Sequence, residues 1–340
     1  MAKELAHFKN FAKLKDTQVA FNDITVIAGK PGTGKSYVMK FMYGINEAPF
    51  VDAHKPNSFA KKIISGDFEI SDIDEGLTQC YSNVLRSIFG NLNQISFKFS
   101  ITYQNMQFLY KNNELIFNRK SNKEYSLSNE CIFVETPLIL EFKKFMRRDE
   151  GKTPYHIESL LNILDTDYSF TDKEQDKFIK EFTQKSKEII KGDIESSGDS
   201  FIFNKEDDKN YDIINASSGT KSIGLLQYLV TNKALKKGSV LYWEEPEVHL
   251  HPEWQLRMIE LFVELMNAGV KIVFSTHSPY MCDYLNAISK KQKFSDRVSF
   301  NLFEEKEGVV TNYILENQKD WNKIQAELLD PLEEIMWEYV

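Results

Sequence analysis

Residues 29–36, GKPGTGKS, constrain this chain more than any other part of its sequence. They have the pattern G-x-x-x-x-G-K-S, in which glycines let successive backbone N–H groups curl around phosphate oxygens. A compact apolar run at 24–28 predicts a strand before the pattern, and an amphipathic run at 36–43 predicts a helix after it, with Gly44 as the helix stop. A chance match in a chain this long has a probability of roughly one per cent. A phosphate-binding loop is therefore favoured over a glycine-rich surface turn.

The residue types in this loop indicate a nucleoside triphosphate with its metal ion. Lys35 supplies a point charge to the β and γ phosphates, and Ser36 offers a hydroxyl to Mg²⁺. ATP and Mg²⁺ are thus the expected cofactors. The residues expected at the nucleotide are Gly29, Lys30, Pro31, Gly32, Thr33, Gly34, Lys35, Ser36 and Tyr37.

A second segment, residues 241–253 with the sequence LYWEEPEVHLHPE, carries the carboxylates that such a loop needs. Residues 240–243 read as a buried strand, and Glu244 and Glu245 stand at its C-terminal end, where α/β sheets place their ligands. This matches a Walker B arrangement. Glu244 is expected to hold the Mg²⁺ shell, and Glu245 to polarise the water that attacks the γ phosphate.

The same segment admits a zinc site as an alternative, built from Glu244, His249 and His251. These residues lack the i, i+4 helical spacing of HExxH, and Pro246 and Pro252 flank them. A packing or capping role for the two histidines at the start of the following helix is favoured.

Two further motifs lie at the start of a predicted helix and at the end of a predicted strand. NASSGTKS, residues 215–222, reads as a loop that opens a helix, and a helix start is an anion site through its free N–H groups and its dipole. FSTHSP, residues 274–279, ends the next predicted strand with His277. Each motif alone is weak, since Ser/Gly turns are common and a single histidine is more often structural.

Length, charge and cysteine content limit the domain size, the ligands and the location that can be expected. The chain has 340 residues with 42% hydrophobic content, enough for one large α/β domain or one domain with an insertion. Its net charge of −8 comes from interspersed charges, so nucleic acid is neither indicated nor excluded as a ligand. Cys80, Cys131 and Cys282 lack disulfide or zinc-ribbon spacing. With no signal peptide or membrane span evident, we expect a cytoplasmic protein without membrane contact.

The middle of the chain differs from its two ends. Residues 95–117 alternate apolar and polar side chains around a turn at Asn112 and Asn113, which predicts antiparallel strands. A helical period follows, with a capping box at Thr171 and Glu174 and an apolar stripe through Phe178, Phe182 and Ile189.

Strands alternate with helices at both ends, which predicts an α/β fold with a mixed, mostly parallel sheet, additional antiparallel strands and a helical insertion. The expected division is an N-terminal part of the core at 1–137, a helical insertion subdomain at 138–195 and a C-terminal part of the core at 196–340.

Taken together, GKPGTGKS, SSG, EEPEVHLHP and STHSP resemble the ABC-type ATPases of the RecF, SMC and OLD (overcoming lysogenization defect) group, and are most like the OLD-type AAA-family ATPase domain. The resemblance implies a P-loop NTPase with an ABC-type core. It also implies that His277 touches the γ phosphate and that two chains form a head-to-tail homodimer. Ser217, Ser218 and Gly219 would then contact the partner chain's ATP.

The chain departs from this group in several places. Glu244 replaces the usual Asp, and because Mg²⁺ demands near-ideal octahedral geometry we expect slow turnover. Pro31 and Thr33 replace the more usual Asn and Ser. Gln104 and Gln107 are the candidates for the Q-loop glutamine. The segment after Pro279 is too short for a Toprim nuclease domain and lacks its DxD pattern, so we do not expect nuclease activity from this chain.

Two functions follow from the resemblance. The first is an ATPase that drives or gates a separate effector, such as a nuclease in phage defence or DNA repair. The alternative is a RecF-like, ATP-controlled clamp on DNA, with the basic runs 143–148 and 289–293 as phosphate contacts. A small-molecule kinase is disfavoured, because the SSG motif and His277 argue against it.

Overall fold

Two compact units make up the structure, a computed structural model that describes residues 3–53, 70–119, 130–143, 153–166, 168, 173–206, 209–316 and 318–328. The first unit comprises Met1–Cys131 and Asp296–Val340, and the second comprises Ile132–Ser295. The chain therefore leaves the first unit once and returns to it, so that the second unit is inserted in sequence.

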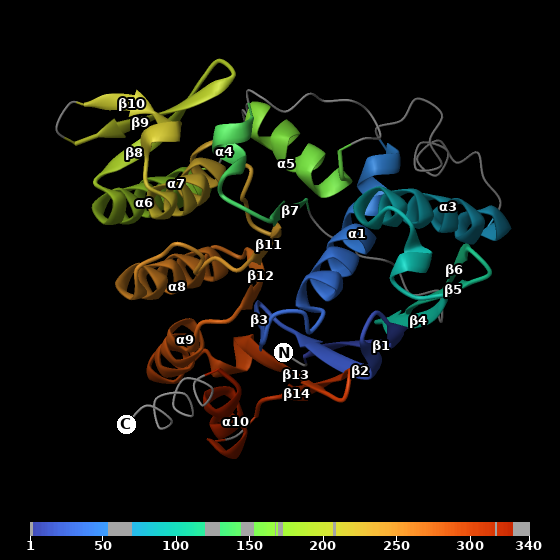
Figure 1. Ribbon diagram of the computed structural model, residues 1–340. Coiled ribbons are helices and arrows are strands. Elements are labelled where there is room, and N and C mark those ends of the chain that lie inside the picture. The colour runs from blue at the N-terminus through green and yellow to red at the C-terminus, as the bar shows by residue number, and fades with distance from the viewer. Residues whose placement is uncertain are drawn as a thin grey trace. The chain divides into compact units, whose positions relative to one another are not determined.

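Among the described residues, the first unit contains eight strands in the order β6-β5-β4-β1-β2-β14-β13-β3 (Figure 1). Their bounds are β1 Glu4–Phe11, β2 Leu14–Phe21, β3 Ile24–Gly29, β4 Lys98–Tyr103, β5 Met106–Lys111, β6 Glu114–Arg119, β13 Val298–Lys306 and β14 Val309–Ile314. Strands β4, β5 and β6 pair antiparallel, as the alternating sequence predicts, whereas β3 pairs parallel with β13. The sheet is thus mixed.

Turn chemistry explains the hairpins. Asn112 and Asn113 join β5 to β6 with φ of 52° and 66°, the left-handed conformation that a two-residue hairpin turn needs and that asparagine tolerates. Gly308, with φ of 75°, ends the β13–β14 turn in the same region. The antiparallel strands and the turn predicted within residues 95–117 are confirmed.

The described part of this unit also contains the helices α1 (Lys35–Ala53), α3 (Ile70–Phe89) and α10 (Gln318–Leu328), and a short 3-10 turn at Leu92–Gln94. Strand β3 is buried at every position, which fits its unbroken run of apolar and small residues. Trp321 and Ile324 anchor α10, and the Trp321 ring packs edge-on against Phe300 of β13 at 4.8 Å between centroids. Helix α10 therefore packs against the sheet at β3 and β13.

The predicted helix stop at Gly44 is wrong. Helix α1 runs through Gly44 to Ala53 and packs against α3. A Cβ atom built on Gly44 would lie 2.8 Å from Leu85 Cδ2 and 3.0 Å from Ile88 Cδ1. The glycine serves a close helix–helix approach, a requirement that comes from a segment some forty residues later and is invisible in the local pattern.

Replacing Gly44 tests this packing. On helix propensity alone a larger residue should stabilise α1 by about 0.5–1 kcal/mol. Because Leu85 and Ile88 are buried and cannot swing into solvent, we expect Gly44→Leu to destabilise the protein by about 1–3 kcal/mol. Chemical denaturation of both proteins measures the difference, and a variant as stable as the wild type would contradict the close packing.

The second unit carries three strands of the order β12-β11-β7, a separate small sheet of the order β10-β9-β8, and six helices among the described residues (Figure 1). Its strands are β7 Cys131–Val134, β8 Gly192–Ser197, β9 Ser200–Lys205, β10 Asn210–Asp212, β11 Val240–Glu244 and β12 Lys271–Thr276. Its helices are α4 Ile139–Phe142, α5 Tyr155–Asp165, α6 Lys173–Ile190, α7 Ser218–Thr231, α8 Pro252–Asn267 and α9 Pro279–Lys291, with a 3-10 turn at Ile213–Asn215. A further 3-10 turn, Ser295–Arg297, spans the boundary back to the first unit.

The α/β class and the mixed sheet are confirmed. Strands β11 and β12 pair parallel, β8 to β10 pair antiparallel, and α6 packs on α7 and α8. The segment 138–195 holds α4, α5, α6 and the start of β8. Its independence as a subdomain stays a prediction.

Parts of that segment are described and parts are not. The capping residue Thr171 lies outside the described residues, and so does the side chain of Glu174. Phe182 of α6 is buried, as the apolar stripe predicts, with Phe178 beside it at 5.6 Å between ring centroids.

Cys80, Cys131 and Cys282 are buried thiols. Burial raises the pKa of the Cys131 and Cys282 thiols, which keeps them protonated. In the ranges that the structure describes, none of the helices is long and apolar enough to cross a bilayer.

Candidate functional site

The loop at residues 29–36 needs glycine for reasons that the backbone shows. Gly29, Gly32 and Gly34 have φ of 141°, 77° and 91°, all in the region that favours glycine. A Cβ atom on Gly29 would lie 2.3 Å from the Phe303 carbonyl oxygen of β13, so a side chain there would clash with the paired strand. The loop can therefore turn sharply out of β3 and expose its N–H groups at the start of α1.

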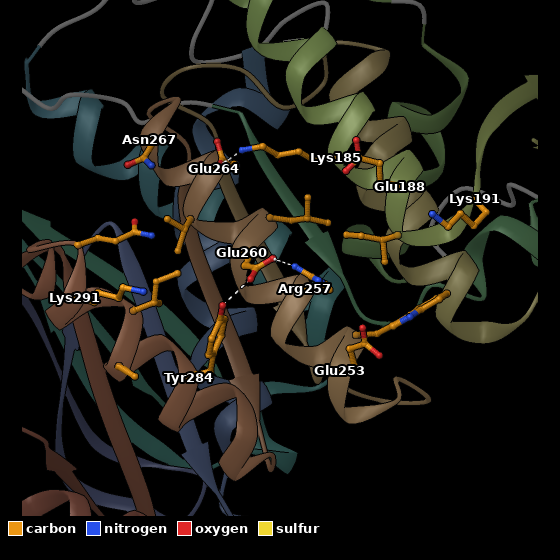
Figure 2. A pocket seen from close by; sticks show the side chains of 17 residues that line it. Lys185, Glu188, Lys191, Glu253, Arg257, Glu260, Glu264, Asn267, Tyr284 and Lys291 are labelled. Carbon is orange, nitrogen blue, oxygen red and sulfur yellow. Dashed lines mark hydrogen bonds and ion pairs between the residues drawn. The ribbon is translucent and has the colours of Figure 1, made fainter.

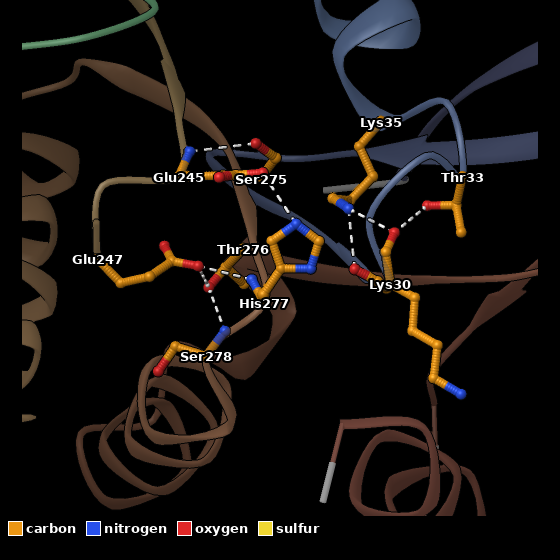
Figure 3. A network of polar contacts seen from close by, with 10 residues as sticks. Lys30, Thr33, Lys35, Glu245, Glu247, Ser275, Thr276, His277 and Ser278 are labelled. Carbon is orange, nitrogen blue, oxygen red and sulfur yellow. Dashed lines mark hydrogen bonds and ion pairs between the residues drawn. The ribbon is translucent and has the colours of Figure 1, made fainter. Parts of the chain in front are cut away.

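Lys35, the first residue of α1, lies across this loop (Figure 3). Its Nζ donates to the carbonyl oxygens of Gly29, at 2.8 Å, and Lys30, at 2.9 Å. Thr33 Oγ1 donates to the same Lys30 carbonyl at 2.9 Å. The ammonium is thus held inside the turn, only 5% exposed, where an incoming phosphate would meet it.

Three more side chains in or beside the loop have partners that the sequence motif does not reveal. Lys13 in the β1–β2 turn pairs with Glu305 of β13, Nζ to Oε2 at 2.7 Å. Lys30 pairs with Glu327 of α10 at 3.6 Å between Nζ and Oε2. Tyr37, 41% exposed, stacks on a phenylalanine of α3. These partners are over fifty residues away in sequence, so only the fold brings them to the loop.

In the second unit, the parallel pairing of β11 and β12 sets the geometry of the carboxylates. Glu244, the last residue of β11, pairs in register with Ser275 of β12. Glu245 then leaves the strand with φ of 45°, a left-handed conformation that costs a non-glycine residue roughly 1 kcal/mol or more. Its backbone N–H donates to Ser275 O and Oγ, each at 3.2 Å, which holds this conformation in place.

Glu245 and His277 meet at this edge of the strands. His277 Nε2 lies 2.8 Å from Glu245 Oε1, and against an ionised carboxylate this nitrogen carries the proton and donates (Figure 3). The Glu245 side chain is 40% exposed and the His277 side chain is 26% exposed, so solvent or a ligand can reach both. The structure therefore brings together two residues that the sequence assigned to one γ-phosphate site.

A third carboxylate, Glu247, supports this pair, and the sequence motifs assign it no role. Its Oε1 accepts from the His277 backbone N–H at 2.6 Å and from Thr276 Oγ1 at 2.8 Å. Oε2 is buried and has no hydrogen-bond partner among the described residues. Burial raises the pKa of the Glu247 carboxyl, against the lowering effect of the hydrogen bonds from His277 and Thr276. The third glutamate of EEPE was the only sequence signal for it.

The histidines of LHP behave as structural residues. His251 is the N-cap of α8, and its Nδ1 accepts from the Glu253 backbone N–H at 3.3 Å. His249 is exposed with φ of 65°. Among the residues that the structure describes, no three His, Cys, Asp or Glu side chains gather as a metal site. The capping role predicted for His251 is confirmed.

The SSG segment starts α7, as predicted. Ser217 is its N-cap, with Oγ accepting from the Thr220 backbone N–H, and it is exposed. Gly219 lies against α8, since a Cβ atom on it would be 3.1 Å from a ring carbon of Trp254. Lys221, buried one turn on, forms an ion pair with Glu141 of α4. The helix start is thus anchored while its first serine faces solvent.

The structure gives the positions of the remaining predicted site residues within each unit, and it does not bring them into one site. Gln104 sits in the β4–β5 turn, where its amide donates to Glu4 Oε2 at 3.0 Å, and Gln107 lies within β5. Lys35 and Ser36 belong to the first unit, and Glu244, Glu245, Ser217 and His277 to the second. Their meeting around one nucleotide stays a prediction.

Comparison with known proteins settles the family. Residues 24–283 match the family model described as "AAA domain, putative AbiEii toxin, Type IV TA system". The chain belongs to this family. It is an ATP-hydrolysing enzyme of the AAA class. No curated protein matches the sequence.

A solved structure supports the fold. The ATPase superposes on an SMC head bound to the C-winged helix domain of ScpA with a TM-score of 0.54 and 13% identity, covering 95% of this chain and 100% of that one. The SMC head domain from Thermotoga maritima gives a TM-score of 0.48 and 12% identity over 93% of this chain and 100% of that chain. At such low identity the first likeness shows the fold alone.

A separate groove of about 810 Å³ lies between α6, α8 and α9 of the ATPase (Figure 2). None of the residues assigned to the nucleotide lines it. Its charges balance and partly pair with one another, as in Lys185–Glu264 and Arg257–Glu260, while the Tyr284 hydroxyl donates to Glu260. This groove therefore favours neither a phosphate chain nor a cation.

The raised pKa of Glu247 predicts a pH-dependent stability difference. Because the folded-state pKa lies above the unfolded one, the carboxyl contributes stability that is present below the unfolded pKa and is lost as pH rises through the folded pKa. Glu247→Gln imitates the protonated carboxyl. We expect its melting temperature to exceed that of wild type at pH 8 and to converge with it toward pH 5, as measured by calorimetry without nucleotide. A constant difference across this range would contradict the assignment.

Proposed function

We propose that this ATPase binds Mg–ATP between the loop at residues 29–36 and the C-terminal ends of β11 and β12, with Glu245 as the general base and His277 as the contact to the γ phosphate. The observation that carries the proposal is the 2.8 Å hydrogen bond between Glu245 Oε1 and His277 Nε2 at the ends of two adjacent parallel strands. Ligands of open α/β sheets bind at this edge.

Each side chain has a step that its geometry supports. The Lys35 ammonium exchanges its bonds to the Gly29 and Lys30 carbonyls for β- and γ-phosphate oxygens. Glu245 accepts a proton from the attacking water as the water oxygen bonds to the γ phosphorus and the bond to the β-phosphate oxygen breaks, which releases ADP and phosphate. The His277 N–H, held by Glu245 at rest, turns to a γ-phosphate oxygen.

The residues present fit a magnesium ion. Mg²⁺ prefers oxygen ligands and is usually held by one or two carboxylates together with substrate phosphates, so a cage of three or more protein carboxylates is not required. The exposed Ser36 at the start of α1 and Glu244 at the end of β11 would hold it. When bound, Mg²⁺ neutralises charge on the β and γ phosphates. The longer Glu244 in place of Asp supports slow turnover.

Two substitutions separate hydrolysis from binding. Glu245→Gln removes the base, so we expect kcat to fall about 10²–10⁴-fold while ATP still binds. Lys35→Ala should instead lose nucleotide affinity, because the phosphate charge loses its partner. Phosphate release and a fluorescent ATP analogue measure the two effects. Unchanged turnover in Glu245→Gln would refute Glu245 as the base.

We infer a head-to-tail homodimer in which the SSG segment of one chain closes over the ATP of the other. Ser217 is exposed at a helix start, and Gly219 packs against Trp254. Exposed apolar side chains occur in the same loops: Ile214 is 45% exposed, and Val248, just after the catalytic glutamates, is 39% exposed. A second chain that closes over this helix start would cover these apolar side chains.

Mixing two inactive variants tests the shared site. Ser218→Glu places a negative charge at the helix start, and it avoids the tight contact with Trp254 that a Cβ atom on Gly219 would make. Combined with Lys35→Ala, it should restore about one working site per heterodimer, since each partner supplies the half that the other lacks. No ATPase activity on mixing, with both variants folded, means that the site is not shared.

Regulation of a separate effector extends this function. The family description, which names a putative toxin of a type IV TA system, supports a place among defence systems, in line with the OLD-like resemblance. An ATP-dependent change between monomer and closed dimer gives the ATPase a state that an effector, such as a nuclease, can read.

The DNA-clamp alternative loses part of its support. Lys143, at the start of the run 143–148, is buried and forms an ion pair with Asp165 at 2.7 Å, so it is not available to phosphates. The rest of that run lies outside the described residues. In the second run, Lys290, Lys291 and Lys293 are exposed. Short exposed basic runs of this kind are common on solvated helix ends.

A further inference from the structure

We propose that Glu247 is a positioning residue for ATP hydrolysis, which holds the loop carrying His277 so that its imidazole reaches Glu245 and the γ phosphate. The inference rests on the proposed function, in which Glu245 is the base and His277 the phosphate contact. Glu247 itself touches neither substrate nor water in this role. It acts through His277.

The first observation is where Glu247 binds. One oxygen, Oε1, accepts from both the His277 backbone N–H at 2.6 Å and Thr276 Oγ1 at 2.8 Å. Hydrogen bonds to an ionised acceptor are short and strong, and two of them on adjacent residues fix a loop in both position and orientation. The bond to the backbone of His277 sets where its side chain begins.

The second observation is that further hydrogen bonds hold the same loop. Thr276 Oγ1 accepts from the Ser278 backbone N–H at 2.9 Å, and Ser278 Oγ, the N-cap of α9, donates to Gln255 Oε1 of α8 at 2.5 Å. Residues 276–278 are thus tied at successive points between β12 and α9. Among these contacts, the hydrogen bonds to Glu247 connect residues 276–278 with the segment that carries Glu245.

The third observation is that one short segment carries both the base and the anchor. Only Pro246, with its fixed φ, separates Glu245 from Glu247. Beyond it, the Val248 N–H donates to the Glu245 carbonyl at 3.0 Å, and the Leu250 N–H donates to the Glu247 carbonyl at 2.8 Å. A rigid turn therefore sets the separation of the two carboxylates, and through Glu247 it sets the distance from Glu245 to His277.

A purely structural anchor would not need this residue type. Oε2 of Glu247 is buried and has no hydrogen-bond partner in the part of the chain that the structure describes. A buried carboxylate with an unsatisfied oxygen costs stability, whereas a smaller neutral acceptor could hold a loop at lower cost. The length of glutamate is what allows one oxygen to span from the base segment to the backbone of His277. Positioning of reacting groups explains this, because a displacement of about 1 Å can cost roughly 10²-fold in rate.

A double-mutant cycle between Glu247 and His277 tests the inference. Glu247→Ala should lower kcat by roughly 10–10²-fold, with the affinity for ATP and the KM unchanged. In a His277→Ala background the same substitution should cause no further loss, because the group it positions is absent. Glu247→Gln keeps an acceptor at Oε1 and should recover most of kcat. A loss that multiplies with that of His277→Ala, or a wild-type kcat in Glu247→Ala, overturns the proposal.

Controls separate the ways in which this test can fail. Glu253→Ala removes an exposed glutamate of α8 and should leave kcat unchanged. Melting temperatures of all variants show whether Glu247→Ala is folded, and Glu247→Gln tests the same bond if it is not. If Glu245→Gln and His277→Ala both hydrolyse ATP normally, the proposed function itself is wrong. If both are inactive and Glu247→Ala is fully active, only the positioning role is wrong.

Discussion

The parallel pairing of β11 with β12 is the constraint on which the catalytic half of this ATPase depends. Because Glu244 pairs with Ser275, the C-terminal ends of both strands lie at the same edge of the sheet. The residues that follow must therefore lie side by side, namely Glu245 after β11 and Thr276 and His277 at the end of β12. A one-residue slip would send every side chain of a strand to the opposite face. Buried apolar residues along both strands oppose such a slip. The site is thus a consequence of sheet register, which the core determines.

Backbone conformation places the two phosphate-contacting elements, and it does so by different means. In the loop at residues 29–36, glycines adopt positive φ without strain, and the close approach of β13 to Gly29 excludes any other residue there. At Glu245 the chain needs a carboxylate, so the left-handed conformation is imposed on a residue that disfavours it, and hydrogen bonds from its N–H to Ser275 maintain it. Strain of this kind in a non-glycine residue concentrates at functional sites.

Local patterns predicted the elements well and their long-range partners poorly. The strand at β3, the turn at Asn112 and Asn113, the helix starts at Ser217 and His251 and the ends of β11 and β12 all followed from periodicity and capping chemistry. Gly44 did not, because a helix-stop signal and a close helix–helix contact use the same residue, and the deciding neighbour, Leu85, belongs to α3. Glu247 was read as one acid among several for a similar reason. Its role depends on the backbone of His277, thirty residues away.

The three glutamates of EEPE differ in what surrounds them, and this explains why their order matters. Glu244 closes a buried strand, Glu245 is partly exposed beside His277, and Glu247 turns inward to a place where burial raises its pKa. An exposed carboxylate can reach a ligand, whereas a buried one mainly fixes geometry. The ATPase therefore accepts a stability cost at Glu247 next to a strained backbone at Glu245. Both costs fall on one turn, and that turn determines where the base lies relative to the histidine.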